Sequence, residues 1–402
     1  MTRREFGFSL SAFTMASRLA TAATGVDQNT IWRRGTGLRA LDVARSSPGL
    51  TLFAPIRGGG SIYLIDLKGR LAHLWRMPYP PGYGYLTEKG TLFYNGKIPG
   101  ETFIAKAPFG CGVVLEADWN GRVLWEVRNA NHHHDGRLLK NGNALLLCSA
   151  ELPDEFARRV KGGMPGTEVS GKMWGDYLLE VTKDGRTVWE WRTWDHLDPD
   201  EYPIPFIQND RSEWAHANSV SELADGNLLV SFRNISTVVK IDRKSGRVVW
   251  KLGTPPLAGQ HAPVELSNGN ILIFDNGPVR LDQTFPFSRV IEVNPATNQI
   301  VWKYQDANPQ SFFSDRISNA QRLPNGNTLI NEGVFGRFFE VTPAGEVVWE
   351  YVNPYFGPAN KPAQNQTNNV FRVYRYTEEE ITRARAGRIV TNYPRRADRR
   401  RV

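Results

Sequence analysis

The sequence predicts an all-β fold, a six-bladed β-propeller closed by a short C-terminal strand and followed by a short helix. Three recurrent features carry this prediction. Six segments close on a tryptophan, at spacings of 50, 64, 61, 52 and 47 residues: Trp75, Trp125, Trp189, Trp250, Trp302 and Trp349. Four of these tryptophans follow a glycine by four residues: Gly121, Gly185, Gly246 and Gly345. Four repeats also contain the turn Leu-x-Asn/Asp-Gly-Asn, at 139–143, 223–227, 266–270 and 323–327.

Each repeat is interpreted as two hairpins, because Asn-Gly and Asp-Gly pairs between apolar runs are strong hairpin signals. A four-stranded unit cannot bury both faces alone, so six units are expected to pack radially, with the tryptophans between neighbouring blades. The propeller domain is predicted over residues 25–376. Its first blade begins near Leu50, and Val370–Tyr376 is expected to close the ring. Residues 377–402 are expected to form a short helix, capped by Thr377, and a basic tail.

Two insertions interrupt the repeats. Residues 151–175 lie inside the third repeat, and residues 193–213 lie between the third and fourth. Long excursions in a compact domain are usually functional loops. We therefore expect these two segments to roof a central pocket.

The chain ends indicate export and exclude some classes of partner. The net charge is +8, of which residues 395–401 contribute +4, so the excess is interpreted as a solvated tail and no nucleic-acid partner is predicted. No apolar run is long enough for a membrane span.

The N-terminal residues are typical of a twin-arginine export signal over residues 1–24. They contain Arg3-Arg4, then a mostly apolar stretch, then Ala20-Thr21-Ala22, and they predict a periplasmic or secreted protein.

The two cysteines, Cys111 and Cys148, fit neither a metal motif nor a redox pair. They are interpreted as two separate buried thiols, with one disulfide as the alternative in an exported chain.

Histidines recur at the starts of the predicted innermost strands. Counted back from the glycine of the following turn, His134 and His261 lie eight residues away, and His132 and His216 lie ten away. Positions two residues apart share a strand face, so these side chains are expected to converge on the propeller axis. His133 is expected to point the other way and to be structural.

Residues around these histidines leave more than one chemistry open. Arg233 ends the second strand of the fourth repeat and is expected to reach the same space, which favours an anionic ligand. The set His132, His134, His216 and His261 is also a plausible metal site. Asp135 is the only carboxylate close to it in the chain. The sequence therefore leaves alternatives to an enzyme that transfers an anionic group. They are a quinone- or metal-dependent oxidoreductase or hydrolase, and a non-catalytic binding propeller.

Combined motifs from 216 to 277 resemble the bacterial aryl-sulfate sulfotransferase family. They are His216-Ala-Asn218-Ser-Val with Ser231-Phe-Arg233, then Lys240-Ile-Asp with Gly246 and Trp250, then Gln260-His261 and Phe274-Asp-Asn-Gly277. His134-Asp135 before Asn141-Gly-Asn fits an earlier motif of the same family. The resemblance implies a six-bladed propeller with a central site that moves a sulfuryl group from a phenolic sulfate ester to a phenol, without a nucleotide donor or cofactor.

The resemblance also implies roles for single residues. His261 would be the nucleophile, forming a sulfohistidine in a ping-pong cycle, and His134, His216 and Arg233 would stabilise the anion. His132, Asn218 and Trp214 are candidates for substrate binding. Aromatic side chains in and beside the insertions are candidates for holding the aryl ring: Trp194, Tyr202, Phe206 and Trp214. The predicted partners are a small aryl sulfate donor and a phenolic acceptor, and the oligomeric state is left open.

Overall fold

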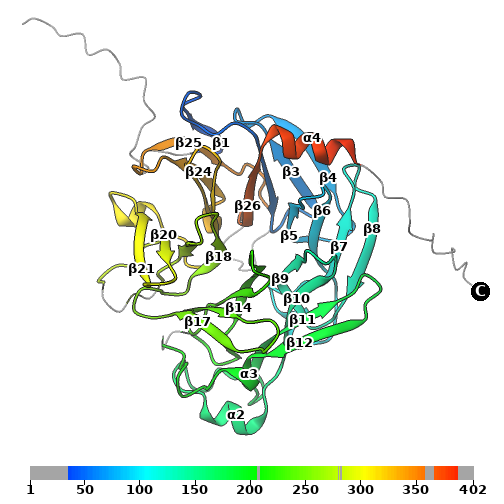
Figure 1. Cartoon of the computed structure of the whole chain (residues 1–402), viewed down its shortest axis with the longest axis vertical. Coiled ribbons are helices and arrows are strands. Elements are labelled where there is room, and N and C mark those ends of the chain that lie inside the picture. Colours follow the sequence, from blue (N-terminus) through cyan, green and yellow to red (C-terminus); the bar gives the residue numbers. More distant parts are fainter. Residues whose placement is uncertain (1–34, 206–208, 279, 281–282, 358–365, 388–402) are drawn as a thin grey trace, which may run out of the picture.

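The computed structural model describes residues 35–205, 209–278, 280, 283–357 and 366–387. Six antiparallel sheets radiate from a common centre, as Figure 1 shows, and this confirms the predicted six-bladed β-propeller. The strands β9, β14, β18 and β26 lie nearest the centre of that view.

The first three blades share one plan, in which the innermost strand is named first and the outermost last. Blade 1 consists of β26 (Val370–Tyr376), β2 (Leu50–Pro55), β3 (Ser61–Ile65) and β4 (Leu71–Arg76). Blade 2 consists of β5 (Pro81–Leu86), β6 (Leu92–Lys97), β7 (Gly112–Ala117) and β8 (Val123–Arg128). Blade 3 consists of β9 (His132–Leu138), β10 (Ala144–Glu151), β11 (Trp174–Val181) and β12 (Thr187–Arg192), with β13 (Glu213–Trp214) parallel to β11.

The remaining blades follow the same order. Blade 4 consists of β14 (Ala217–Glu222), β15 (Leu228–Phe232), β16 (Thr237–Ile241) and β17 (Val248–Leu252). Blade 5 consists of β18 (His261–Glu265), β19 (Ile271–Asp275), β20 (Arg289–Asn294) and β21 (Gln299–Tyr304). Blade 6 consists of β22 (Asn319–Arg322), β23 (Thr328–Glu332), β24 (Arg337–Val341) and β25 (Val347–Val352), with β1 (Gly37–Leu41) outermost.

Short turns join the first two strands of blades 3 to 6, as the repeated Leu-x-Asn/Asp-Gly-Asn motif predicts. Their glycines, Gly142, Gly226, Gly269 and Gly326, have φ between 79° and 87°. A side chain is unfavourable at that φ, so glycine is the residue that the turn requires. The turns set the register of each hairpin and therefore which strand residues face the hub.

Tryptophans join neighbouring blades, as predicted. Indole N–H groups of three blades each donate to the blade that follows: Trp250 to Asn298 Oδ1 (2.8 Å), Trp302 to the Pro343 oxygen (2.9 Å) and Trp349 to the Leu67 oxygen (2.8 Å). In blade 3 this bond comes from Trp191, which donates to the Gly246 oxygen at 2.8 Å, and the predicted Trp189 is only partly buried.

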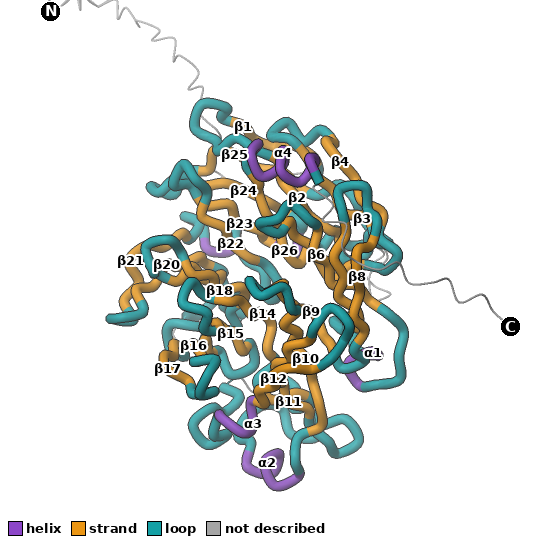
Figure 2. Tube along the Cα trace, turned by 45° about the vertical axis from the view of Figure 1, so that its right-hand side comes forward, coloured by secondary structure: helices purple, strands orange, loops and turns teal. Residues whose placement is uncertain are grey.

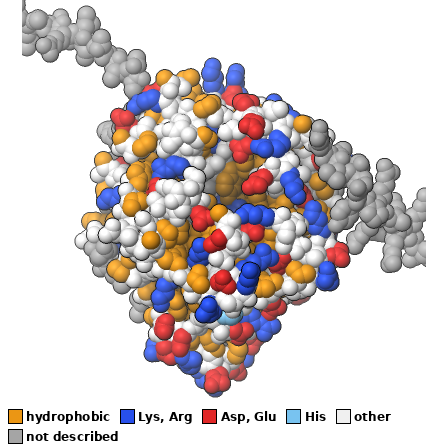
Figure 3. Space-filling model, in the orientation of Figure 1, with side chains coloured by type: hydrophobic (Ala, Val, Ile, Leu, Met, Phe, Trp, Pro, Cys, Tyr) orange, Lys and Arg blue, Asp and Glu red, His pale blue; other side chains and the backbone are white. Residues whose placement is uncertain are grey.

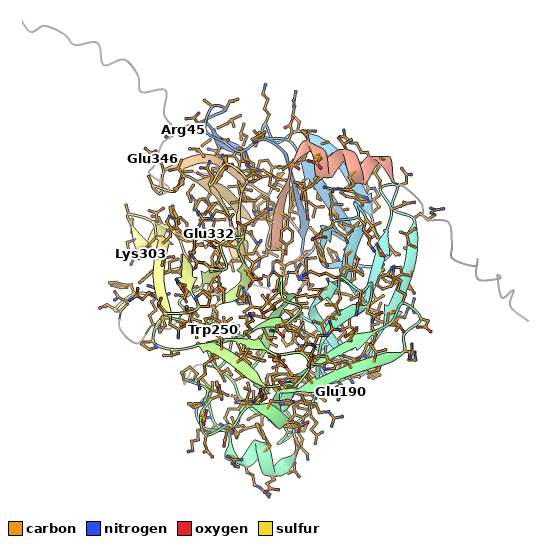
Figure 4. The ribbon with its side chains drawn as sticks, in the orientation of Figure 1. Arg45, Glu190, Trp250, Lys303, Glu332 and Glu346 are labelled. Atoms are coloured by element: carbon orange, nitrogen blue, oxygen red, sulfur yellow. The ribbon has the colours of Figure 1, made fainter. Side chains whose placement is uncertain are left out.

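Two strands close the ring at its chain ends. β26 pairs with β2 and becomes the innermost strand of blade 1, which confirms the predicted closure. β1, which the sequence does not predict, pairs with β25 on the outer edge of blade 6. An ion pair of 2.8 Å between Arg45 and Glu346 lies beside this second closure (Figure 4).

The closing strand also carries Arg372 to the hub. Its guanidinium donates to the backbone oxygens of Ser318 (2.6 Å) and Asn218 (3.0 Å). Because these residues belong to blades 6 and 4, one buried side chain of blade 1 links three blades behind the site described below.

The helices are short and peripheral. They are α1 (Phe103–Lys106), α2 (Asp154–Arg159), α3 (Thr193–His196) and α4 (Glu378–Ala386), with the 3-10 turns η2 (Pro309–Ser311) and η3 (Gly333–Phe335). The predicted cap of α4 is present, since Thr377 and Glu380 form a capping box. Within the described ranges, no helix has the length and apolar character needed to cross a lipid bilayer.

The two insertions pack against each other beyond β11 and β12, where Figure 2 shows α2 and α3 together. Arg211 joins them by donating to the oxygens of Val160 (3.1 Å) and Gly162 (2.6 Å). This packing holds the end of the second insertion over the hub, as the cavity lining shows below.

Some predictions fall on residues that the structure does not describe. The export signal over 1–24, the basic tail and Phe206 lie outside the described residues and stay predictions. Cys111 and Cys148 are both buried and both free, which agrees with their interpretation as two separate thiols.

Candidate functional site

A cavity of about 290 Å³ lies at the hub of the propeller. Figure 1 places the innermost strands around the centre of the propeller, and Figure 3 shows a hollow there on the face that carries α4. The cavity is lined by Phe109, His134, Asn209, Asp210, Glu213, His216, Arg233, Asn234, His261, Arg316 and Ile317. Two arginines and three histidines share this lining with the carboxylates of Asp210 and Glu213 and with two apolar side chains, so the cavity offers donors for an anionic group beside an apolar surface.

The four residues predicted as catalytic all line this cavity. His134 lies on β9, His216 immediately precedes β14, His261 begins β18 and Arg233 follows β15. The rings of His134 and His216 lie 5.2 Å apart between centroids. Blades 3, 4 and 5 therefore bring these side chains to one place.

The predicted substrate-binding residues are placed elsewhere. His132 faces the interior of the fold, with its ring nitrogens 2.9 Å from the Leu147 oxygen and 3.2 Å from Asn95 Oδ1, and burial lowers its pKa to about 3. Asn218 donates to the Gln260 oxygen at 2.7 Å, behind the cavity wall. None of these side chains is among those that line the cavity.

The prediction that His132 faces the cavity is wrong because side chains do not alternate regularly between the two faces of β9. The pairing of β9 with β10 shifts between Leu146 and Cys148, so His132 and His134 do not share a face as counting predicts. His133, expected to point away, contacts His134 directly instead, with their Nδ1 atoms 2.8 Å apart.

Of the candidate aromatic residues, the three that the structure describes pack against the core of the fold and do not line the cavity: Trp194, Tyr202 and Trp214. Trp214 is fully buried, donates to the Tyr202 oxygen at 3.0 Å and lies 4.7 Å from the Phe156 ring. Of the two insertions expected to roof the pocket, only the second contributes to the lining, through Asn209, Asp210 and Glu213, and no residue of 151–175 lines the cavity.

Phe109, which the sequence analysis missed, is the aromatic side chain of the cavity. It lies in the long connection between β6 and β7, and its ring is 5.0 Å from that of His216 and 5.6 Å from that of His134. Its place on the wall gives the cavity an apolar surface beside the imidazoles.

The tautomer of His261 is set by its neighbours. Its Nδ1 lies 2.8 Å from Asn276 Oδ1, and the Asn276 amide group donates to the oxygens of Ser314 and Ile317, which turns that oxygen toward the ring. The Ile317 N–H donates to His261 Nε2 at 3.1 Å. His261 therefore carries its proton on Nδ1 and a lone pair on Nε2.

The charge state of His261 follows from its surroundings. Burial, and then the positive charges of Arg372 and Arg233, hold its pKa well below the usual value. The ring is therefore neutral at neutral pH, which is the form that acts as a nucleophile.

His216 has the opposite electrostatic environment. Burial alone lowers the pKa of this histidine, but the charge of Glu213 and its hydrogen bond to Nδ1 at 2.9 Å outweigh burial and raise the pKa above the usual value. Since Glu213 holds Nδ1, the other ring nitrogen of His216 is left for the cavity. The geometry favours a cationic donor at this position.

His134 is neutral and is held by another imidazole. Burial, and then the neighbouring His133, keep the pKa of His134 well below the usual value. Asp135, the carboxylate nearest in sequence, does not contact these rings: it accepts hydrogen bonds from the Tyr83 hydroxyl and the Val220 N–H. The carboxylates that face the histidines are instead Glu213 and Asp176.

Arg233 presents part of its guanidinium without a partner. Nη1 donates to Asn234 Oδ1 at 3.0 Å, whereas the buried Nε has no hydrogen-bond partner among the described residues. A buried donor left unpaired is unfavourable, so this side chain is suited to binding an oxyanion.

Strained backbone surrounds the cavity. Five residues at the starts of the inner strands of blades 4, 5 and 6 have positive φ although none is glycine: Ala215 (74°), His216 (49°), Ala262 (48°), Ile317 (52°) and Ser318 (85°). Such conformations cost on the order of 1–3 kcal/mol each and cluster at functional sites. Here they aim side chains and the Ile317 N–H at the hub.

Metal ligation has no preformed site here. Within the described ranges, no three His, Cys, Asp or Glu side chains are arranged to hold a metal ion.

Comparisons with known proteins identify the family of the chain. A family model described as Arylsulfotransferase (ASST) matches residues 101–354, a span that includes His134, His216, Arg233 and His261. No curated protein matches the chain.

Two solved structures are similar to the chain. A protein of unknown function from Bacteroides caccae is 15% identical, with 83% of this chain and 100% of that chain covered and a TM-score of 0.52, a likeness that concerns the fold alone. Virginiamycin B lyase from Staphylococcus aureus is 12% identical, with 81% of this chain and 91% of that chain covered and a TM-score of 0.43. The family match extends over more than half of the sequence, and the chain belongs to the arylsulfotransferase family.

Proposed function

We propose that the protein is an aryl-sulfate sulfotransferase in which His261 Nε2 carries the sulfuryl group between a phenolic sulfate ester and a phenol. The observation that supports this most directly is the tautomer of His261, whose proton is held on Nδ1 by Asn276 so that Nε2 is the basic atom. No nucleotide donor or cofactor takes part in this scheme.

The transfer has two half-reactions. In the first, Nε2 forms a bond to sulfur, the bond between sulfur and the aryl oxygen breaks, and the leaving phenolate receives a proton. In the second, an acceptor phenol loses a proton and its oxygen attacks sulfur, while the N–S bond breaks. Splitting the transfer through a covalent intermediate replaces one difficult step with two easier ones.

Arg233 and His216 stabilise the sulfuryl oxygens in this scheme. Sulfuryl transfer resembles phosphoryl transfer, in which the protein mainly positions groups and stabilises charge on the equatorial oxygens. Arg233 offers its unpaired Nε–H, and His216, paired with Glu213, offers a charged N–H. His134 is then the group placed to exchange a proton with the phenol oxygen.

The test of this function is an assay with 4-nitrophenyl sulfate. Without acceptor, the protein is expected to release one equivalent of 4-nitrophenol per chain and to carry a sulfuryl group on His261, detected by mass spectrometry. Adding phenol should discharge the labelled protein and form phenyl sulfate. Transfer that requires donor and acceptor to be bound together, with no labelled chain, would contradict the proposal.

The Glu213–His216 pair predicts the pH dependence of transfer. The protonated form of His216 is needed, and its raised pKa means that activity is lost as pH rises through that pKa. In Glu213→Gln the carboxylate is gone, so burial and Arg233 lower the pKa of His216. The alkaline limb of kcat/KM is therefore expected to move to lower pH.

A matched control for this measurement is Glu222→Gln, which neutralises a carboxylate of β14 that does not line the cavity. Its pH profile should be that of the unmodified protein. An alkaline limb that stays in place in Glu213→Gln would show that protonated His216 is not required.

A further inference from the structure

A chain of three buried side chains leads away from the cavity through blade 3. His134 Nδ1 lies 2.8 Å from His133 Nδ1, and His133 Nε2 lies 3.3 Å from Asp176 Oδ1. His133 and Asp176 are fully enclosed, with side chains 0% and 2% exposed. Among the described residues, neither His133 Nε2 nor Asp176 Oδ2 has a hydrogen-bond partner, so the contact between the imidazole and the carboxylate is electrostatic and lacks hydrogen-bond geometry.

The contact between the two Nδ1 atoms requires one proton between them, because two lone pairs at 2.8 Å repel each other. When His133 keeps its proton on Nε2 toward Asp176, its Nδ1 is an acceptor and His134 donates. His134 Nε2, the nitrogen left for the cavity, is then a base. When the pair of imidazoles takes up one more proton, His133 donates from its Nδ1 to the Nδ1 of His134. His134 Nε2 then carries a proton that it can donate into the cavity.

We propose that Asp176 and His133 are positioning residues that relay a proton to and from His134 during the two half-reactions. This inference rests on the proposed function and deepens it. In the second half-reaction the acceptor phenol passes its proton to His134 Nε2 as its oxygen bonds to sulfur and the N–S bond breaks. The Nδ1 proton of His134 moves to His133, and in the first half-reaction both transfers run backward to the leaving phenolate. No proton is gained or lost over the cycle.

The relay places the extra positive charge where the fold stabilises it. An imidazolium at His134 lies in the field of His216, His261 and Arg372, whereas an imidazolium at His133 lies beside the Asp176 carboxylate. A buried charge is retained at low cost only next to an opposite charge. Without Asp176, there is no stabilised position on His133 for the proton that the pair takes up in the second half-reaction and holds until the next donor reacts.

The experiment measures the first half-reaction in single turnovers with two donors, 4-nitrophenyl sulfate and phenyl sulfate. 4-Nitrophenolate is stable without a proton, whereas the more basic phenolate needs one as it leaves. Asp176→Asn is expected to lower the rate of the first half-reaction at least about 100-fold with phenyl sulfate and no more than about threefold with 4-nitrophenyl sulfate. His133→Gln should show the same selectivity. His132→Gln, a neighbour on the same strand that does not line the cavity, should change both donors by one common factor.

The outcomes separate the relay from a structural role. Equal losses for both donors in Asp176→Asn, or no loss, would overturn the relay while the unmodified protein still transfers the sulfuryl group. If the variants do not fold, the same single-turnover rates are compared in the unmodified protein. Similar rates for the two donors support the relay, and a rate that falls steeply with the basicity of the leaving phenol overturns it. An unmodified protein that transfers from neither donor would overturn the proposed function and the relay together.

Discussion

Replacing His261 with alanine is expected to lower turnover with 4-nitrophenyl sulfate and phenol by about 10⁴-fold or more, because the proposed mechanism assigns the nucleophilic nitrogen to this residue. The variant should also carry no sulfuryl label when it is incubated with the donor alone. Rate assays and intact mass measure the two effects separately.

The control for His261→Ala is His196→Ala. His196 stacks on Trp191 with ring centroids 4.8 Å apart and does not line the cavity, so both its label and its turnover should persist. Full labelling of His261→Ala would place the nucleophile on another side chain, and full turnover without labelling would remove the covalent intermediate altogether.

Replacing Arg233 with alanine is expected to have the second largest effect, a decrease in kcat of about 10²- to 10³-fold in both half-reactions. The reason is that Arg233 lines the cavity with an unpaired Nε–H, and in the proposed mechanism its charge acts most strongly on the sulfuryl oxygens of the transition state. Arg233→Lys keeps the charge but loses the planar fork, so it should recover only part of the rate.

Steady-state and single-turnover kinetics together test this prediction. Arg247→Ala, which removes an exposed arginine of blade 4, should leave both constants unchanged. A rise in KM at constant kcat in Arg233→Ala would show that the arginine only binds the sulfate group and does not act on the transition state.

The fold was predictable because its signals are local and repeated. Each turn glycine and each blade-closing tryptophan is specified within a few residues, and six copies make the pattern visible in one sequence. The closing role of Val370–Tyr376 follows from the need of blade 1 for an inner strand. The pairing of β1 with β25 was not predictable in this way, because Gly37–Leu41 is short and lies outside the repeat.

The site was predictable only in part. His134, His216 and His261 lie at or near the starts of innermost strands and Arg233 directly follows the second strand of blade 4, so their convergence follows from the fold. The exchange of roles between His132 and His133 comes from an irregular pairing of β9 with β10, which residue counting cannot detect.

The supporting residues come from tertiary contacts. Asn276 reaches His261 from the end of the neighbouring strand, and Asp176 reaches His133 from two strands away. Glu213 is only three residues before His216, but its approach depends on how the second insertion folds.

The hydrogen bond from the Ile317 N–H limits what else the Nε2 atom of His261 can bind. An imidazole nitrogen has a single lone pair in the ring plane, so Nε2 cannot accept the Ile317 N–H and bond to sulfur at the same time. In the proposed mechanism this hydrogen bond therefore has to break before His261 bonds to sulfur. The backbone at Ile317 and Ser318 has positive φ, which is unfavourable, so movement of this segment would release part of that conformational cost.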